Sequence, residues 1–214
     1  MEVKTKYGTM LMNIKEQNYK EHSEMSYERE FLSYLEDEEY DFFVDIGAAW
    51  GYFSIPASFK AKMVLAFEPS DERRELLEKN VKSLQCLNVV TSSHAIGTGS
   101  LNLFFGHGMF GPKTGRRPDR NGVIWNSLEE VMEYCRGHTV IKIDVEGNEI
   151  DVIKSIGNLE DYHDKVTWLI ERHYKEGILG CTEKELFDVM KPYKGELVET
   201  RKWTWHYIFR KKDG

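Results

Sequence analysis

The sequence predicts an α/β fold with a mostly parallel central sheet. Apolar runs alternate with stretches of helical periodicity, and the runs lie at 42–46, 63–67, 88–91, 140–143 and 166–170. This alternation favours parallel strands joined by right-handed helical crossovers. Ligands of such sheets bind beyond the carboxyl ends of the strands. The residues that follow each strand are therefore the first candidates for a functional site.

A turn containing two glycines follows the first of these strands. Its sequence is Asp45-Ile46-Gly47-Ala48-Ala49-Trp50-Gly51-Tyr52, and a helix is expected over 53–60 directly after it. The first glycine allows a tight reversal and a close approach of the backbone to a ligand. The helix would then present free N–H groups to that ligand. The alternative is an ordinary strand–helix turn, since glycine motifs alone are weak signals.

The second strand ends in Glu68, about twenty residues after the turn. An acidic residue at this point can accept hydrogen bonds from both hydroxyls of a ribose, which indicates an adenosine-containing cofactor. The spacing D-x-G-x-x-x-G differs from the G-x-G-x-x-G of dinucleotide sites, and the Gly-Lys-Ser/Thr of a P-loop is absent. Asp45 would repel a pyrophosphate but would tolerate the amino group or sulfonium of S-adenosylmethionine, so that cofactor is favoured.

Two further polar groups follow apolar runs: Asp144 with Glu146 after the fourth run, and Glu171 with His173 after the fifth. Acids at a helix N-terminus are also favoured by the helix dipole alone. We expect Asp144, Glu171 and His173 to meet at one edge of the sheet as catalytic residues, where any of them could act as a general base. Alternatively, Asp144, Glu146 and Glu171 could bind a divalent cation, but without a strong metal motif no metal ligand is assigned.

The composition is that of one globular domain with small additions. Of 214 residues, 41% are apolar and 30% are charged, and the net charge of −7 disfavours nucleic acid and anionic membranes as partners. The cysteines at 86, 135 and 181 form neither a disulfide framework nor a zinc motif, which favours a reducing cytoplasm. Neither a membrane-length apolar stretch nor a signal-peptide pattern is found.

The chain is expected to divide into an N-terminal cap and a core domain. Residues 1–40 would form a cap packed on the core domain, with a hairpin around Gly8 and a helix capped by Ser26. Residues 41–214 would form the core domain. Within it, a helix is expected over 70–83, and the pairs Ser127/Glu130 and Thr182/Glu185 are capping boxes that start two more helices, the first running to about 134. Strands at 197–200 and 204–209 would form a terminal hairpin.

An insertion at 106–121 interrupts the core domain, with extra strands expected on either side at 101–105 and 123–125. It carries four glycines and two prolines, which permit large backbone changes. We expect a mobile lid over the acceptor site, in which Arg116 and Arg117 bind an anionic substrate. A surface insertion whose arginines only maintain solubility is the alternative.

The segments FVDIGAAWGYFSIPAS, VLAFEPS followed by LLEKN, HAIG and IKIDVEGNEIDVI resemble the FkbM family of S-adenosylmethionine-dependent methyltransferases. The resemblance covers about residues 40 to 157. It implies a class I methyltransferase (Rossmann-like) fold, with a mostly parallel seven-stranded sheet flanked by helices and an antiparallel terminal strand. It also implies O-methylation of a hydroxyl on a small molecule, sugar or glycan, which is anionic if the cations of 106–121 bind it.

The resemblance also assigns site residues. It implies that the methionine part lies on the glycine turn, the ribose at the end of the second strand and the adenine beside the third, with an acid close to the sulfonium. The cofactor-binding residues would be Asp45, Gly47, Ala48, Gly51, Tyr52, Glu68, Pro69, His94, Ala95 and Asp144. An RNA methyltransferase that uses the cations of 106–121 on phosphates, and a non-catalytic binding module, are the alternative functions. The oligomeric state is open.

Overall fold

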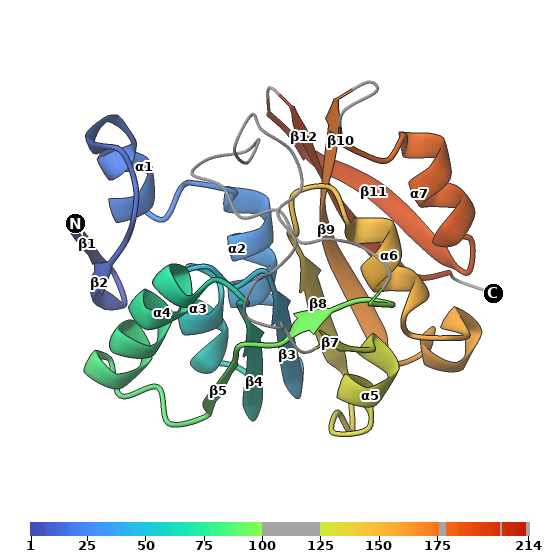
Figure 1. Ribbon diagram of the computed structural model, residues 1–214, viewed down its shortest axis with the longest axis horizontal. Coiled ribbons are helices and arrows are strands. Elements are labelled where there is room, and N and C mark those ends of the chain that lie inside the picture. Colours follow the sequence, from blue (N-terminus) through green and yellow to red (C-terminus); the bar gives the residue numbers. More distant parts are fainter. Residues whose placement is uncertain (100–124, 176–178, 202, 213–214) are drawn as a thin grey trace.

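The computed structural model describes residues 1–99, 125–175, 179–201 and 203–212. Its centre is a sheet in the strand order β11-β12-β9-β8-β3-β4-β5, and the short β10 (Leu179–Gly180) pairs with β9 beside this path (Figure 1). The seven strands are β3 (Phe42–Ile46), β4 (Met63–Phe67), β5 (Val89–Ser92), β8 (Thr139–Ile143), β9 (Val166–Lys175), β11 (Tyr193–Thr200) and β12 (Thr204–Lys211). Within the described residues, no helix has the length and apolar character needed to cross a membrane.

Five strands, β5, β4, β3, β8 and β9, run parallel, and β12 lies antiparallel between β9 and β11. The predicted fold class, with its antiparallel terminal strand, is therefore confirmed. All of β8 is buried, as are four of the five residues of β3. Central parallel strands are covered on both faces, and this is why they appear in the sequence as continuous apolar runs.

The strand register aligns the carboxyl ends of the parallel strands. Ile46 of β3 pairs with Phe67 of β4 and with Ile143 of β8, and Ile143 pairs with Ile170 of β9. The next residues along each strand therefore emerge at one edge of the sheet; they are Gly47, Glu68, Asp144 and Glu171. This edge is where the sequence predicts the site.

Strand β9 is longer than the sequence predicts. The apolar run ends at 170, but the strand continues to Lys175, because β12 pairs with it as far as His173 and β10 pairs with Tyr174 and Lys175. Glu171 and His173 therefore lie within a strand instead of following one. They extend beyond the end of the parallel neighbour β8, whose pairing with β9 stops at Ile170.

Helices cover both faces of the sheet (Figure 1). On one face α2 (Arg29–Asp37) and α3 (Ser54–Ser58) pack on β3, β9 and β12, with α4 (Asp71–Ser83) beside β5. The other face carries α5 (Leu128–Met132), α6 (Glu149–Lys154) and α7 (Glu183–Val189), with the short η2 (Leu159–Tyr162) between α6 and α7 along the chain. The helices expected over 53–60 and 70–83 are found with shorter bounds.

Both predicted capping boxes are present. Ser127 accepts the N–H of Glu130 while the Glu130 side chain accepts the N–H of Ser127, and Thr182 with Glu185 does the same at α7. These reciprocal bonds satisfy N–H groups that a helix start leaves unpaired. Helix α5 ends at Met132, before the expected position 134.

The N-terminal segment begins with the predicted hairpin, formed by β1 (Glu2–Thr5) and β2 (Gly8–Leu11), and continues through η1 (Glu16–Asn18) and α1 (Tyr19–Ser23). Val3 and Met10 are buried in one cluster with Phe31 of α2 and Phe43 of the sheet. The cap predicted for α2 is wrong, because the Ser26 hydroxyl donates to the Glu21 carbonyl. The helix starts instead after Glu28, which has a left-handed backbone with φ of 51°.

The insertion at 106–121, with Arg116 and Arg117, lies outside the described residues, and so does the strand expected at 101–105. The lid and its contacts with an acceptor therefore stay predictions. Of the strand expected at 123–125, only Trp125 is described. It belongs to β7 (Trp125–Asn126), which pairs in parallel with β6 (Ala95–Ile96).

Candidate active site

A pocket opens at the carboxyl ends of the parallel strands, where the turns after β3, β4 and β8 meet. It is lined by Ile46, Gly47, Phe67, Glu68, Pro69, Arg73, His94, Ala95, Ile96, Trp125, Asp144, Val145, Glu146, Asn148 and Val152. Apolar side chains form much of the wall, and carboxylates stand at the ends of β4 and β8. The pocket thus joins an apolar surface to a few placed polar groups, as small-molecule sites do.

The structure divides the ten predicted cofactor residues into two groups. Six of them line the pocket, namely Gly47, Glu68, Pro69, His94, Ala95 and Asp144. Asp45, Ala48, Gly51 and Tyr52 are not part of that lining. Tyr52 is buried and donates its hydroxyl to the Tyr27 carbonyl at 2.9 Å, and a Cβ on Gly51 would come within 2.8 Å of the Leu77 side chain. Gly51 and Tyr52 therefore pack the turn against neighbouring elements instead of facing the pocket.

The carboxylate of Glu68 is fixed by the two turns next to it. Oε2 accepts the N–H of Ala49 and Oε1 accepts the N–H of Ser70, each at 2.9 Å. Burial raises the pKa of Glu68, and both backbone donors and Arg73 act against that shift by favouring the charged form. Each carboxylate oxygen has a further lone pair, so a preorganised acceptor is left at the pocket wall.

The amides of the glycine turn itself are bonded within the protein. The amides of Gly47 and Ala48 both donate to the Phe67 carbonyl at 3.0 Å, and the Gly51 amide donates to the Ala48 carbonyl at 2.8 Å. Gly47 has φ of +84°, and a Cβ there would lie 1.8 Å from the backbone oxygen of Asp144. The glycine is therefore needed for the close approach of the β3 and β8 chain ends.

Lys142 is a site residue that sequence reasoning missed. It is fully buried in β8, where its ammonium donates to Asp144 Oδ2 at 3.2 Å and lies 3.7 Å from Asp45 Oδ1. Asp45 also accepts the Ser54 hydroxyl at 2.6 Å. Burial lowers the pKa of Lys142, but Asp144 and Asp45 raise it by more, so the ammonium is charged. A lysine within the apolar run VIKI was the available signal, because unpaired lysines are almost never fully buried.

His173 lies at the centre of a group of carboxylates. Its Nδ1 is 2.9 Å from Glu149 Oε1, while its Nε2 lies 3.8 Å from Asp144 Oδ1 and 3.6 Å from both Glu146 Oε2 and Glu171 Oε1. The structure thus brings together the three residues that we predicted would converge. It adds Glu149, which the sequence analysis did not assign.

The charges of this cluster depend on one another. Burial lowers the pKa of His173, but the hydrogen bond to Glu149 and the nearby carboxylates raise it well above the usual value. Burial raises the pKa of Glu146 to about 7, with His173 acting in the opposite direction. For Glu171, the effect of burial is outweighed by His206 and His173, which together lower the pKa.

A second buried group continues from Glu171 toward the N-terminal segment. Pairing of β12 with β9 sets His206 opposite Glu171, with Nε2 at 3.4 Å from Glu171 Oε1 and Nδ1 at 3.6 Å from Glu199 Oε2. Burial lowers the pKa of His206, yet Glu171 and Glu199 raise it to about 10. Glu28 is 1% exposed, and one of its oxygens joins Glu171 and His206 in a group whose ligand atoms lie within 4.8 Å of one another.

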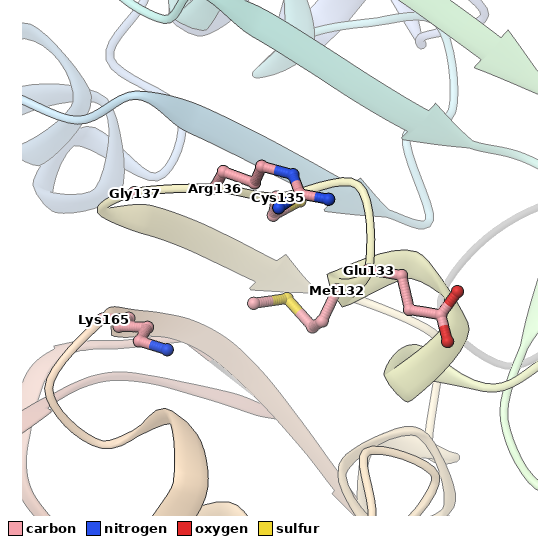
Figure 2. Close-up of a pocket in the computed structure, with 6 residues that line it drawn as sticks. All are labelled: Met132, Glu133, Cys135, Arg136, Gly137 and Lys165. Carbon is pink, nitrogen blue, oxygen red and sulfur yellow. The ribbon is translucent and has the colours of Figure 1, made fainter.

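Figure 2 shows a different hollow, at the amino ends of β8 and β9. It is lined by Met132, Glu133, Cys135, Arg136, Gly137 and Lys165. Ligands of parallel sheets bind at the carboxyl ends, and this hollow lies at the opposite end of the strands. We assign it no part in the site.

The chain is similar to known proteins in both sequence and fold. The model of the methyltransferase FkbM domain matches residues 45–191. The structure resembles a methyltransferase FkbM from Methylobacillus flagellatus KT, with 14% identity and a TM-score of 0.57, over 79% of this chain and 43% of that one. This chain therefore spans less than half of that protein's length.

Two further solved structures share the fold at low identity. An rRNA methylase from Streptococcus thermophilus has a TM-score of 0.52 and 12% identity, over 94% of this chain and 99% of that one. A protein from Streptococcus mutans, assigned as a methyltransferase and solved in complex with SAH, has a TM-score of 0.50 and 10% identity. The match covers 88% of this chain and 97% of that one. A search of curated proteins gave no match. Because the domain match covers well over half of the chain, the protein belongs to the FkbM family of methyltransferases.

Proposed function

We propose that the protein is an S-adenosylmethionine-dependent O-methyltransferase that acts on a hydroxyl of a small molecule, sugar or glycan. The observation that carries this proposal is the pocket itself, which combines Glu68 at the end of β4 with Asp144 and Glu146 at the end of β8. The family and the fold support methyl transfer in general. The arrangement of these acids supports the particular roles given below.

The residues of the pocket fit the cofactor in three respects. Glu68 offers fixed lone pairs to two ribose hydroxyls, Ile96 and Trp125 offer apolar surface to an adenine ring, and Asp144 offers negative charge to a sulfonium. When bound, S-adenosylmethionine supplies an electrophilic methyl group. Much of the rate of such a transfer can come from holding the two reactants in line and away from water.

The acids that line the pocket are suited to hold the acceptor hydroxyl and to take its proton. Asp144 and Glu146 are part of the lining, with side chains 26% and 28% exposed. Glu171 and His173 are buried behind them. We therefore assign proton acceptance to the carboxylates at the end of β8 and a positioning role to His173, whose ring is held by Glu149 with Nε2 facing them.

A carboxylate-rich edge favours a neutral hydroxyl over a phosphate next to the reacting group. The net charge of −7 also counts against RNA as the acceptor. The likeness to an rRNA methylase at 12% identity is a likeness of fold alone. An anionic group elsewhere on the acceptor, bound by Arg116 and Arg117, stays a prediction.

Replacing Glu68 with glutamine tests the cofactor assignment. The glutamine keeps the size of the side chain but removes the charge that strengthens hydrogen bonds from the ribose, a loss of about 1.5–3 kcal/mol. We expect S-adenosylmethionine to bind roughly tenfold or more weakly in isothermal titration calorimetry. Glu75→Gln, on the exposed surface of α4, serves as the control and should leave the affinity unchanged. Equal affinities for both variants would remove Glu68 from the site.

A further inference from the structure

We propose that Asp144, Glu146 and His173 form a binding site for a divalent metal ion at the wall of the pocket. One potential ligand atom from each residue belongs to a set whose members all lie within 4.8 Å of one another. That spacing suits ligands around one ion, since metal–ligand bonds of about 2.0–2.2 Å separate neighbouring donor atoms by about 3–4 Å. Two of the three residues, Asp144 and Glu146, line the pocket, so an ion held there would face the acceptor.

The orientation of His173 is the observation that points from an acidic cluster to a metal site. Glu149 is fully buried, and its carboxylate holds Nδ1 at 2.9 Å. Histidine ligands are commonly fixed in this way, by a carboxylate on the ring nitrogen that does not bind the metal. The other nitrogen, Nε2, is thereby directed at Asp144, Glu146 and Glu171.

No hydrogen bond satisfies Nε2 within the described part of the chain, although His173 is only 2% exposed. Its three carboxylate neighbours lie 3.6–3.8 Å away, which is beyond hydrogen-bonding distance. Glu146 Oε2 is buried and lacks a hydrogen-bond partner among the described residues. Buried polar atoms are normally satisfied, and an ion between the two residues would give Glu146 Oε2 a partner and would bind Nε2 as well.

The charge of the surroundings also favours a cation. The carboxylates of this region face the ammonium of Lys142 and the imidazoles of His206 and His173, and His173 would be neutral as a metal ligand. The carboxylates are Asp45, Asp144, Glu146, Glu149 and Glu171. A bound divalent ion would reduce this excess of negative charge at the point where Asp144 and Glu146 approach each other.

The ligand set differs from the alternative considered from the sequence, because His173 takes the place of Glu171. One imidazole with two carboxylates suits Mn²⁺, Fe²⁺ or Zn²⁺ better than Ca²⁺ or Mg²⁺, which prefer oxygen ligands alone. Three protein ligands leave coordination positions open. If the proposed function holds, the acceptor hydroxyl would occupy one of these positions, and its pKa would fall as that of a metal-bound water does.

Binding of Mn²⁺ alone, without cofactor or acceptor, tests the site. After removal of metals by EDTA and dialysis, electron paramagnetic resonance of the full chain titrated with MnCl₂ should show one bound ion per chain. Pulsed measurements of the bound ion should show coupling to an imidazole nitrogen. Glu146→Gln should weaken binding by at least about tenfold, and His173→Gln should abolish the nitrogen coupling.

The second buried group provides the matched control. Glu28→Gln changes a carboxylate in the group with Glu171 and His206, so it should leave Mn²⁺ affinity within about twofold of the parent. Circular dichroism melting checks that each variant folds. If the Glu146→Gln variant does not fold, Asp144→Asn is measured in its place. Absence of saturable binding at millimolar Mn²⁺, or binding that is lost only in Glu28→Gln, would overturn the proposal.

The experiment separates this inference from the proposed function. Calorimetry of S-adenosylmethionine in EDTA reports on the cofactor site without the metal. Mn²⁺ binding without cofactor binding would leave the metal site in place and reject the methyltransferase assignment, and the converse result would reject the metal site alone.

Discussion

Lys142→Met should lower the free energy of unfolding by about 3–5 kcal/mol, which is the cost of breaking a buried ion pair by removing one partner. The methionine fills a similar volume, so little of this loss comes from packing. Asp45 is fully buried, and Lys142 is the cation that faces it at 3.7 Å. Removing the ammonium leaves that carboxylate buried with the Ser54 hydroxyl as its hydrogen-bond partner.

Urea unfolding followed by circular dichroism measures this loss. Lys79→Met, on the exposed face of α4, should change the free energy of unfolding by less than about 0.5 kcal/mol. The double variant Asp45→Asn with Lys142→Met should recover part of the loss, because no charge at position 45 is then left without its partner. A single-variant loss below about 1 kcal/mol would show that Asp45 is neutral in the folded protein.

Gly47→Ala should destabilise the fold and also prevent cofactor binding. A left-handed backbone costs an alanine about 1–2 kcal/mol, and the added Cβ would meet the Asp144 backbone oxygen at 1.8 Å. A backbone atom cannot rotate away, so the chain ends of β3 and β8 must separate. Because Gly47 and Asp144 both line the pocket, we expect S-adenosylmethionine affinity to fall by more than about tenfold.

Gly157→Ala separates the cost of the left-handed backbone from the cost of the clash between the added Cβ and Asp144. Gly157 has a similar φ of +79°, but its Cβ would meet only the Glu129 carboxylate, at an ordinary 3.4 Å. This control should show the cost of the backbone conformation, in thermal melting, with cofactor affinity intact. If both variants lose the same stability and both bind the cofactor, the close approach of the strand ends is not required.

Much of the sheet could be predicted because its central strands are covered on both faces. The runs at 42–46 and 63–67 are strands with those bounds, and the run at 140–143 is one residue short of β8. The end of β9 was missed because Glu171-Arg172-His173 looks like the polar end of a strand. Only pairing with β12, distant in sequence, keeps these residues in the sheet.

The residues of the candidate site also fall into those that could be placed from the sequence and those that could not. Gly47, Glu68 and Asp144 could be placed at one edge because a parallel register brings successive strand ends together. Glu149 and His206 could not, since their roles depend on contacts with His173 and Glu171 across the fold. Charged residues on distant elements carry no periodic signal, and their pairing appears only when the strand order is known.

The buried position of Glu28 sets how far the chain can be shortened without damage. The family match begins at residue 45 and stops at 191, yet Glu28 and His206 both lie in the charged interior beside Glu171. A fragment limited to residues 45–191 would lack both Glu28 and His206. Water would then reach the charged interior, and Glu171 would lose its histidine partner on β12. The shortest unit that can be exchanged between relatives or expressed on its own therefore starts before α2 and ends with β12.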